Sequence, residues 1–213
     1  IVTNIDKEHL DYYKSFNNLL EAFKAFIEKT PPIGKSFLFL DDLNIRRMIK
    51  RLRTKNYLTY GFHKDSNYQV CNIKYEINYT KFDLKIRNVG SKNPHIKNIL
   101  LNLIGKHNVI NATAAISLCL NLGLKENIIK KALKNFSGVQ RRLTKVFKKN
   151  KIEFYDDYAH HPTEIESVLQ GVRVVAPKRK IISVFQPHRY SRIKSLKLEF
   201  SSCFKNSDQV ILC

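Results

Sequence analysis

The 213-residue sequence predicts an α/β protein in two parts, a mixed region with an antiparallel β-meander followed by a parallel βαβαβ region. The meander is indicated by apolar residues that alternate with polar ones at Ile73, Tyr75, Ile77 and Tyr79, and again at Phe82, Leu84 and Ile86. After residue 142, apolar strand-like runs alternate with helical patterns, which is typical of a parallel sheet. We therefore expect two domains, 1–142 and 143–213.

Apolar spacing and chain breakers place the other elements. Residues 1–5 are expected to leave a buried strand, and 16–28 to form a helix that Pro31 and Pro32 stop. Asp41 or Asp42 is expected to cap a helix ending near Leu52. The remaining expected strands are 37–40, 57–62, 96–104, 152–156, 180–185 and 209–213, the last of them buried, and the remaining helices are 111–122, 125–135, 162–175 and 191–204.

Composition excludes some classes of protein. Lys and Arg outnumber Asp and Glu by 38 to 18, a net charge of +20. The lysines are spread along the chain beside many Ile and Asn residues, so nucleic acid is not the expected main partner. No run approaches the ~18 apolar residues of a membrane span. The four cysteines form no CxxC pair and lie among apolar residues, which favours buried free thiols in a reducing cytoplasm.

The most informative segment is Asp156-Asp157-Tyr158-Ala159-His160-His161-Pro162-Thr163-Glu164. It follows an apolar strand, and Pro162 and Glu164 suit the first turn of a helix. Ligands bind at this end of strands in open α/β sheets. Asp and His are also ordinary helix caps, but two acids, a tyrosine and two histidines exceed what a cap needs. The segment therefore predicts a ligand site.

Three further segments are candidates. Phe185-Gln186-Pro187-His188-Arg189-Tyr190-Ser191-Arg192 follows the next strand, so we expect it at the same sheet edge, where it would clamp a carboxylate or phosphate. Gly105-Lys106-His107-Asn108 leads into a helix that also carries Asn111, which suits a nucleotide. The segment from Thr3 to Asp11 follows a strand and carries potential ligands for a Mg²⁺ ion bound to phosphate. Each also fits a plain solvated loop or helix start.

In this order, the four segments resemble the Mur ligase family, which adds amino acids to UDP-muramate precursors. The resemblance covers essentially the whole chain, and the segments 156–164 and 185–192 together are most similar to the member that adds L-alanine. It implies that 1–142 are the later part of a P-loop-type central ATPase domain and 143–213 part of a Rossmann-like C-terminal domain. The P-loop and the UDP-sugar domain are missing from this sequence, and both ends look cut, so we expect this chain alone to be inactive.

The resemblance also implies ligands and roles. ATP and Mg²⁺ are the expected cofactors, with UDP-N-acetylmuramate and L-alanine as substrates joined through an acyl phosphate. It implies that His9 binds or approaches the metal, and that His160, His188, Arg189 and Arg192 act in catalysis. The residues implied for ATP are His107, Asn108, Asn111, Arg142 and Asp157, and those implied for the amino acid are Tyr158, His160, His188, Arg189 and Arg192.

Two alternatives stay open. The related ligase that reattaches recycled tripeptide is similar around the other three segments, but it lacks the His-Arg-Tyr-x-Arg pattern of residues 188–192. A basic nucleic-acid-binding protein is the second alternative, suggested only by the net charge of +20. Assays of substrate choice and of salt-dependent nucleic-acid binding would separate these classes.

Overall fold

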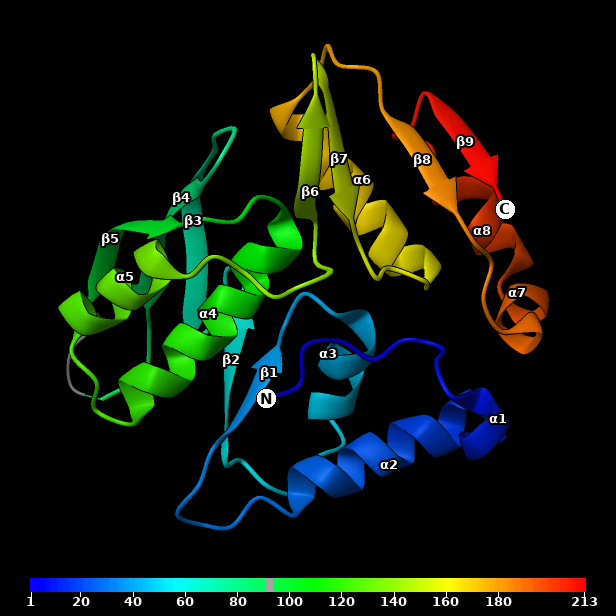
Figure 1. Ribbon diagram of the computed structural model, residues 1–213. Coiled ribbons are helices and arrows are strands. Elements are labelled where there is room, and N and C mark those ends of the chain that lie inside the picture. Colours follow the sequence, from blue (N-terminus) through cyan, green and yellow to red (C-terminus); the bar gives the residue numbers. More distant parts are fainter. Residues whose placement is uncertain (91–93) are drawn as a thin grey trace. The chain divides into compact units, whose positions relative to one another are not determined.

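The computed structural model describes residues 1–90 and 94–213 (Figure 1). The chain folds into two compact units. The first contains residues 1–74, 81–100 and 109–134, and the second contains 75–80, 101–108 and 135–213. The fold class is α/β, as the sequence predicted, while the single boundary near residue 142 stays a prediction.

A five-stranded sheet with the strand order β1-β2-β3-β4-β5 forms the framework of the first part of the chain. Val2 adds a single parallel bridge to Leu38, so the strand expected at residues 1–5 is reduced to that bridge. β1 and β2 pair in parallel, and Glu76 N donates to Tyr79 O in the turn between β3 and β4. The predicted hairpin is therefore present, but Ile77 and Tyr79, which were expected in its first strand, lie in the turn and are exposed. The strands are β1 (Ser36–Phe39), β2 (Tyr57–Gly61), β3 (Tyr68–Tyr75), β4 (Thr80–Ile86) and β5 (His95–Leu101).

The helices of the first unit follow local capping rules. After the short α1 (Leu10–Tyr13), α2 spans Phe16–Glu28, as predicted, and Ser15 Oγ accepts from Asn18 N at its start. The cap of α3 (Leu43–Ile49) is Asp42, whose Oδ1 accepts from Ile45 N at 2.8 Å. These helices close over a core that contains Val2, Ile5, Leu19, Ile27, Leu38, Ile45, Met48 and Leu52.

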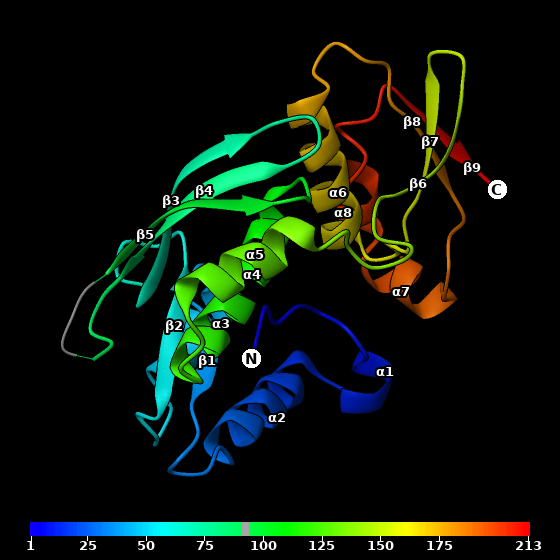
Figure 2. The same cartoon turned by 60° about the vertical axis from the view of Figure 1, so that its left-hand side comes forward.

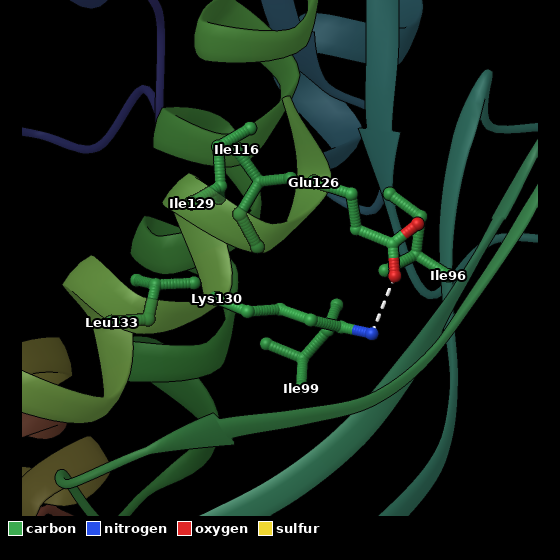
Figure 3. A pocket seen from close by; sticks show the side chains of 7 residues that line it. All are labelled: Ile96, Ile99, Ile116, Glu126, Ile129, Lys130 and Leu133. Atoms are coloured by element: carbon green, nitrogen blue, oxygen red, sulfur yellow. Dashed lines mark hydrogen bonds and ion pairs between the residues drawn. The ribbon is translucent and has the colours of Figure 1, made fainter. Parts of the chain in front are cut away.

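The long helix α4 (Lys106–Asn121) begins five residues before the predicted start at 111. In its first turn, Asn108 Nδ2 donates to Ile104 O, the carbonyl just ahead of the helix. α5 (Glu126–Asn135) follows Gly123, which has a φ of 82°. The Glu126–Lys130 ion pair lies beside a small apolar pocket between β5, α4 and α5, lined by Ile96, Ile99, Ile116, Ile129 and Leu133 (Figure 3).

The strands of the second unit do not form the single parallel βαβαβ sheet that the sequence predicted. β6 (Thr144–Lys149), which the sequence did not predict, pairs antiparallel with β7 (Ile152–Asp156). The turn between them contains Asn150 with a φ of 55°, a conformation that Asn tolerates in tight turns. β8 (Ile182–Phe185) instead pairs in parallel with β9 (Gln209–Leu212). The described strands of this unit therefore form two separate two-stranded sheets.

The helices of the second unit are α6 (Pro162–Val175), α7 (Tyr190–Ser195) and α8 (Lys197–Ser202). The single helix predicted at 191–204 is interrupted at Leu196, whose φ of −120° is not helical. α6 and α8 lie side by side (Figure 2). The prediction that the strand at 209–213 is buried was wrong, because the side chains of β9 are exposed.

All four cysteines are free, as predicted. Cys203 is buried, Cys71 and Cys119 are half-buried and Cys213 is exposed, so the expectation of burial was correct for Cys203 and wrong for Cys213. Among the described residues, no helix has the length and apolar character needed to cross a membrane.

Candidate functional site

The loop between β7 and α6 is a helix start with unusually many polar contacts. His161 is the N-cap, Pro162 occupies the first helical position, and Glu164 completes a capping box. Glu164 Oε2 accepts from His160 N at 3.1 Å and from His161 N at 3.3 Å. The predicted places of Pro162 and Glu164 are therefore confirmed.

Glu164 also contacts two other groups at this loop. Its Oε1 accepts from Arg142 Nη1 at 3.3 Å, and its Oε2 lies 3.7 Å from His160 Nδ1. Burial raises the pKa of the Glu164 carboxyl, but the hydrogen bonds from His160 N and His161 N, with the charges of His160 and Arg142, outweigh burial and leave that pKa below its ordinary value. The carboxylate is therefore ionised at neutral pH.

The ring of His160 is fixed by a backbone carbonyl. Its Nδ1 lies 2.8 Å from Tyr158 O. A carbonyl oxygen only accepts, so Nδ1 carries a proton and a neutral ring has its lone pair on Nε2. The rings of Tyr158 and His160 meet in a T-shaped arrangement at a centroid distance of 5.1 Å, and the Arg141 guanidinium lies 4.7 Å from the centroid of the Tyr158 ring. Tyr158 thus contacts His160 both through its backbone carbonyl and through its ring.

Asp157 joins this loop to the segment that carries the two arginines. Its Oδ2 accepts from Leu143 N and its Oδ1 from Ala159 N, both at 2.7 Å. Tyr158 N in turn donates to Arg141 O at 2.8 Å. Arg141 and Leu143 both have left-handed φ angles, 58° and 48°. The carboxylate of Asp157 therefore holds the backbone around Arg142 in place, and its role toward ATP stays a prediction.

The glycine turn before α4 lies against α6. Gly105 has a φ of 96°, and a Cβ at that position would lie 2.7 Å from Cε1 of the His107 ring. Burial lowers the pKa of His107, opposed by the charge of Asp157 and assisted by that of Arg142, so the ring is neutral at pH 7. His107 Nδ1 is buried and has no hydrogen-bond partner within the described ranges. The role of His107 toward ATP stays a prediction.

The other predicted nucleotide residues share the N-terminal half of α4. Asn108 uses its amide nitrogen to bond Ile104 O, and Asn111 is exposed one turn after His107. His107 and Asn111 are four residues apart on one helix, as predicted. Arg142 and His160 thus share the Glu164 carboxylate, and Asp157 holds the backbone beside Arg142. Asn111 lies one turn after His107 on the same helix.

The second cluster lies between β8 and α7. His188 and Arg189 are exposed, and Arg189 precedes the helix with a left-handed φ of 64°. Arg192 is half-buried inside α7. The prediction that this cluster follows a strand of the same sheet as β7 was wrong, since β7 pairs with β6 and β8 with β9. A shared pocket with Tyr158 and His160 stays a prediction.

His9 is an exposed residue with a φ of 54° at the start of α1. The preceding loop is held by Asp42 Oδ2, which accepts from Ile5 N at 3.2 Å, and by Asn44 Nδ2, which donates to Ile5 O at 2.9 Å. No group of three His, Cys, Asp or Glu side chains suited to a metal occurs in residues 1–90 and 94–213. Because Mg²⁺ prefers several oxygen ligands, His9 does not make a site by itself.

Two features of the site were not predicted. The sequence indicated Glu164 only as a favourable charge at a helix start, although a glutamate three residues after a cap is the usual sign of a capping box. The stacking of Arg141 over Tyr158 joins residues 17 positions apart, and no local pattern indicates it.

Similarity to known proteins defines the class. Residues 1–119 match the Mur ligase middle domain, and residues 141–213 match the Mur ligase, glutamate ligase domain. The chain belongs to the Mur ligase family.

Particular members are similar over the whole chain. The UDP-N-acetylmuramate–L-alanine ligase of Pelagibacter ubique is 52% identical over 213 residues, which cover 100% of this chain and 46% of that protein. The UDP-N-acetylmuramate-alanine ligase MurC of Thermotoga maritima is 28% identical with a TM-score of 0.75, over 99% of this chain and 44% of that one. A Thermotoga maritima MurF ligase solved in complex with ADP shares the fold, with 16% identity, a TM-score of 0.77, and coverage of 98% and 47%. The chain thus spans a little under half of these relatives.

Proposed function

We propose that this chain is part of an ATP-dependent ligase that joins L-alanine to the carboxylate of UDP-N-acetylmuramate in peptidoglycan synthesis in the cytoplasm. The observation that carries the proposal is the 52% identity to an enzyme of that name along all 213 residues. The network around Glu164 supports it, because it holds the His160 imidazole by its Nδ1 and the Arg142 guanidinium around one helix start.

The chemistry requires activation of a carboxylate, which is a poor electrophile. A muramate carboxylate oxygen attacks the γ-phosphorus of ATP, a P–O bond forms, and ADP leaves, giving an acyl phosphate. The alanine amine then attacks the acyl carbon to form a tetrahedral intermediate. Collapse breaks the C–O bond to phosphate, and the amine gives up a proton. The site must therefore stabilise negative charge and accept one proton.

The residues of this chain divide between the two steps. His107, Asn108 and Asn111 bind the nucleoside part of ATP, while Arg142, positioned by Asp157, approaches its phosphates. Tyr158, His188, Arg189 and Arg192 bind L-alanine and the reacting carboxylate. His160 accepts the amine proton on Nε2, since its Nδ1 is engaged by Tyr158 O. Mg²⁺ would neutralise phosphate charge near His9, and the ADP complex of the Thermotoga MurF ligase is consistent with a nucleotide site in this fold.

The test is a chimeric ligase, in which residues 1–213 replace the matching segment of the Pelagibacter enzyme. It should release ADP and phosphate only with UDP-N-acetylmuramate and L-alanine present, and mass spectrometry should detect the alanyl product. A product with the recycled tripeptide but not with L-alanine would support the alternative ligase. Binding to DNA or RNA at physiological salt with a steep salt dependence, without ligase activity, would support the nucleic-acid alternative.

A further inference from the structure

The two oxygens of Glu164 serve two different parts of the site. Oε1 accepts from Arg142 Nη1 at 3.3 Å. Oε2 accepts from the His160 and His161 backbone and lies 3.7 Å from the His160 ring. One carboxylate therefore lies between the group proposed to approach ATP phosphate and the group proposed to accept the amine proton.

Helix capping alone does not account for this arrangement. A capping box needs one glutamate oxygen on the N-cap backbone N–H, a bond that Oε2 makes here with His161. The bond from Oε1 reaches a residue 22 positions earlier, in the segment that Asp157 holds. Because the carboxylate is planar, turning Oε1 with Arg142 also turns Oε2 relative to His160.

We propose that Glu164 is a positioning residue that couples the nucleotide side of the site to the amino-acid side, an inference that rests on the function proposed above. A phosphate that orders Arg142 also fixes the Glu164 carboxylate, which in turn fixes the backbone and ring of His160. Bound ATP therefore improves the binding of L-alanine. By linkage, bound L-alanine improves the binding of ATP by the same factor.

The first experiment needs no ligase activity and uses the 213-residue chain. The NMR resonances of the His160 ring are compared in the unchanged chain, Arg142→Met, Glu164→Gln and the double variant. Glutamine keeps the size and the hydrogen-bond acceptor of the cap but removes the charge. Arg142→Met should shift the His160 ring signals when Glu164 is present and leave them unchanged in the Glu164→Gln background. Equal shifts in both backgrounds would overturn the proposal.

The second experiment measures substrate coupling in the chimeric ligase. The KM for L-alanine is determined at limiting and at saturating ATP. We expect the KM to fall about 5-fold or more with ATP in the unchanged enzyme, a typical allosteric coupling, and to change less than about 2-fold in Glu164→Gln. The same ratio in both enzymes, or no effect of ATP in the unchanged enzyme, would contradict the proposal.

Glu153→Gln is the matched control. It makes the same chemical change in the same unit, at a carboxylate that pairs with Lys145 at 2.8 Å and Arg179 at 3.1 Å. The ratio of its KM for L-alanine at limiting ATP to that at saturating ATP should equal the ratio in the unchanged enzyme. Thermal unfolding of Glu153→Gln and Glu164→Gln measures any loss of stability. If the chimera has no ligase activity while the NMR cycle shows coupling, the proposed function fails, and the linkage of Arg142 to His160 through Glu164 stands without it.

Discussion

Gly171 of α6 packs against Gly105, so that a Cβ at position 171 would lie 3.1 Å from the Gly105 Cα. Both residues lie in the second compact unit. This close backbone approach holds the middle of α6 against the turn that begins α4. The first turn of α6 contains Glu164, so the contact also fixes the helix whose start forms the candidate site.

Substitution of Gly171 by alanine should therefore destabilise the chain. Alanine gains up to about 1 kcal/mol in helix propensity, but overpacking against backbone typically costs about 1–3 kcal/mol. We expect a net loss of about 1 kcal/mol, measured by chemical denaturation, and a larger loss for Gly171→Val. Gln170→Ala, at an exposed neighbouring position, is the control and should change stability little. A Gly171→Ala chain that is more stable than the original would show that the two backbones can separate freely.

The buried imidazole of His107 should make stability depend on pH. Burial lowers its pKa in the folded chain, so the unfolded chain binds the proton more readily. This contribution to stability is present above the ordinary histidine pKa of about 6.5 and is lost as the pH falls through the folded value. Between pH 7.5 and 5, the melting temperature should fall further for the original chain than for His107→Gln. His9→Gln, at an exposed position, is the control, and its melting temperature should depend on pH as in the original chain. If the melting temperatures of all three chains fall equally with pH, the assignment to His107 is refuted.

Arg192 is predicted to bind a carboxylate of the amino-acid substrate. In the chimeric ligase, Arg192→Ala should raise the KM for L-alanine or lower kcat, with a loss in kcat/KM of about 10-fold or more, as expected for a charge-assisted hydrogen bond worth about 1.5–3 kcal/mol. The KM for ATP should change little. Lys194→Ala, at an exposed position of the same helix, is the control. Unchanged kinetic constants in Arg192→Ala would remove Arg192 from the site.

The cysteines should differ in reactivity. Cys203 is 1% exposed, and burial raises the pKa of its thiol to about 11, so little thiolate forms at pH 8. Cys213 is exposed. Timed labelling with iodoacetamide and peptide mass spectrometry should find Cys213 modified early and Cys203 last, while both should react quickly in denaturant. Rapid labelling of Cys203 in the folded chain would contradict its burial.

The sequence alone was sufficient where structure depends on neighbours along the chain. The helix at 16–28, the Asp42 cap and the alternating strand at 80–86 follow from apolar period and capping, which act over a few residues. The segment from Asp156 to Glu164 could be predicted as a candidate site for the same reason, since its side chains and the helix start that positions them are contiguous.

The tertiary structure decided what depends on distant pairing. The pairing of β7 with β6 rather than with β8 was not evident, because apolar runs do not specify their partner strand. The Glu164–Arg142 contact and the close approach of Gly171 to Gly105 join segments 22 and 66 residues apart. Such contacts are selected by packing of the whole unit, so the sequence determined which residues are candidates for the site and the fold determined which of them lie together.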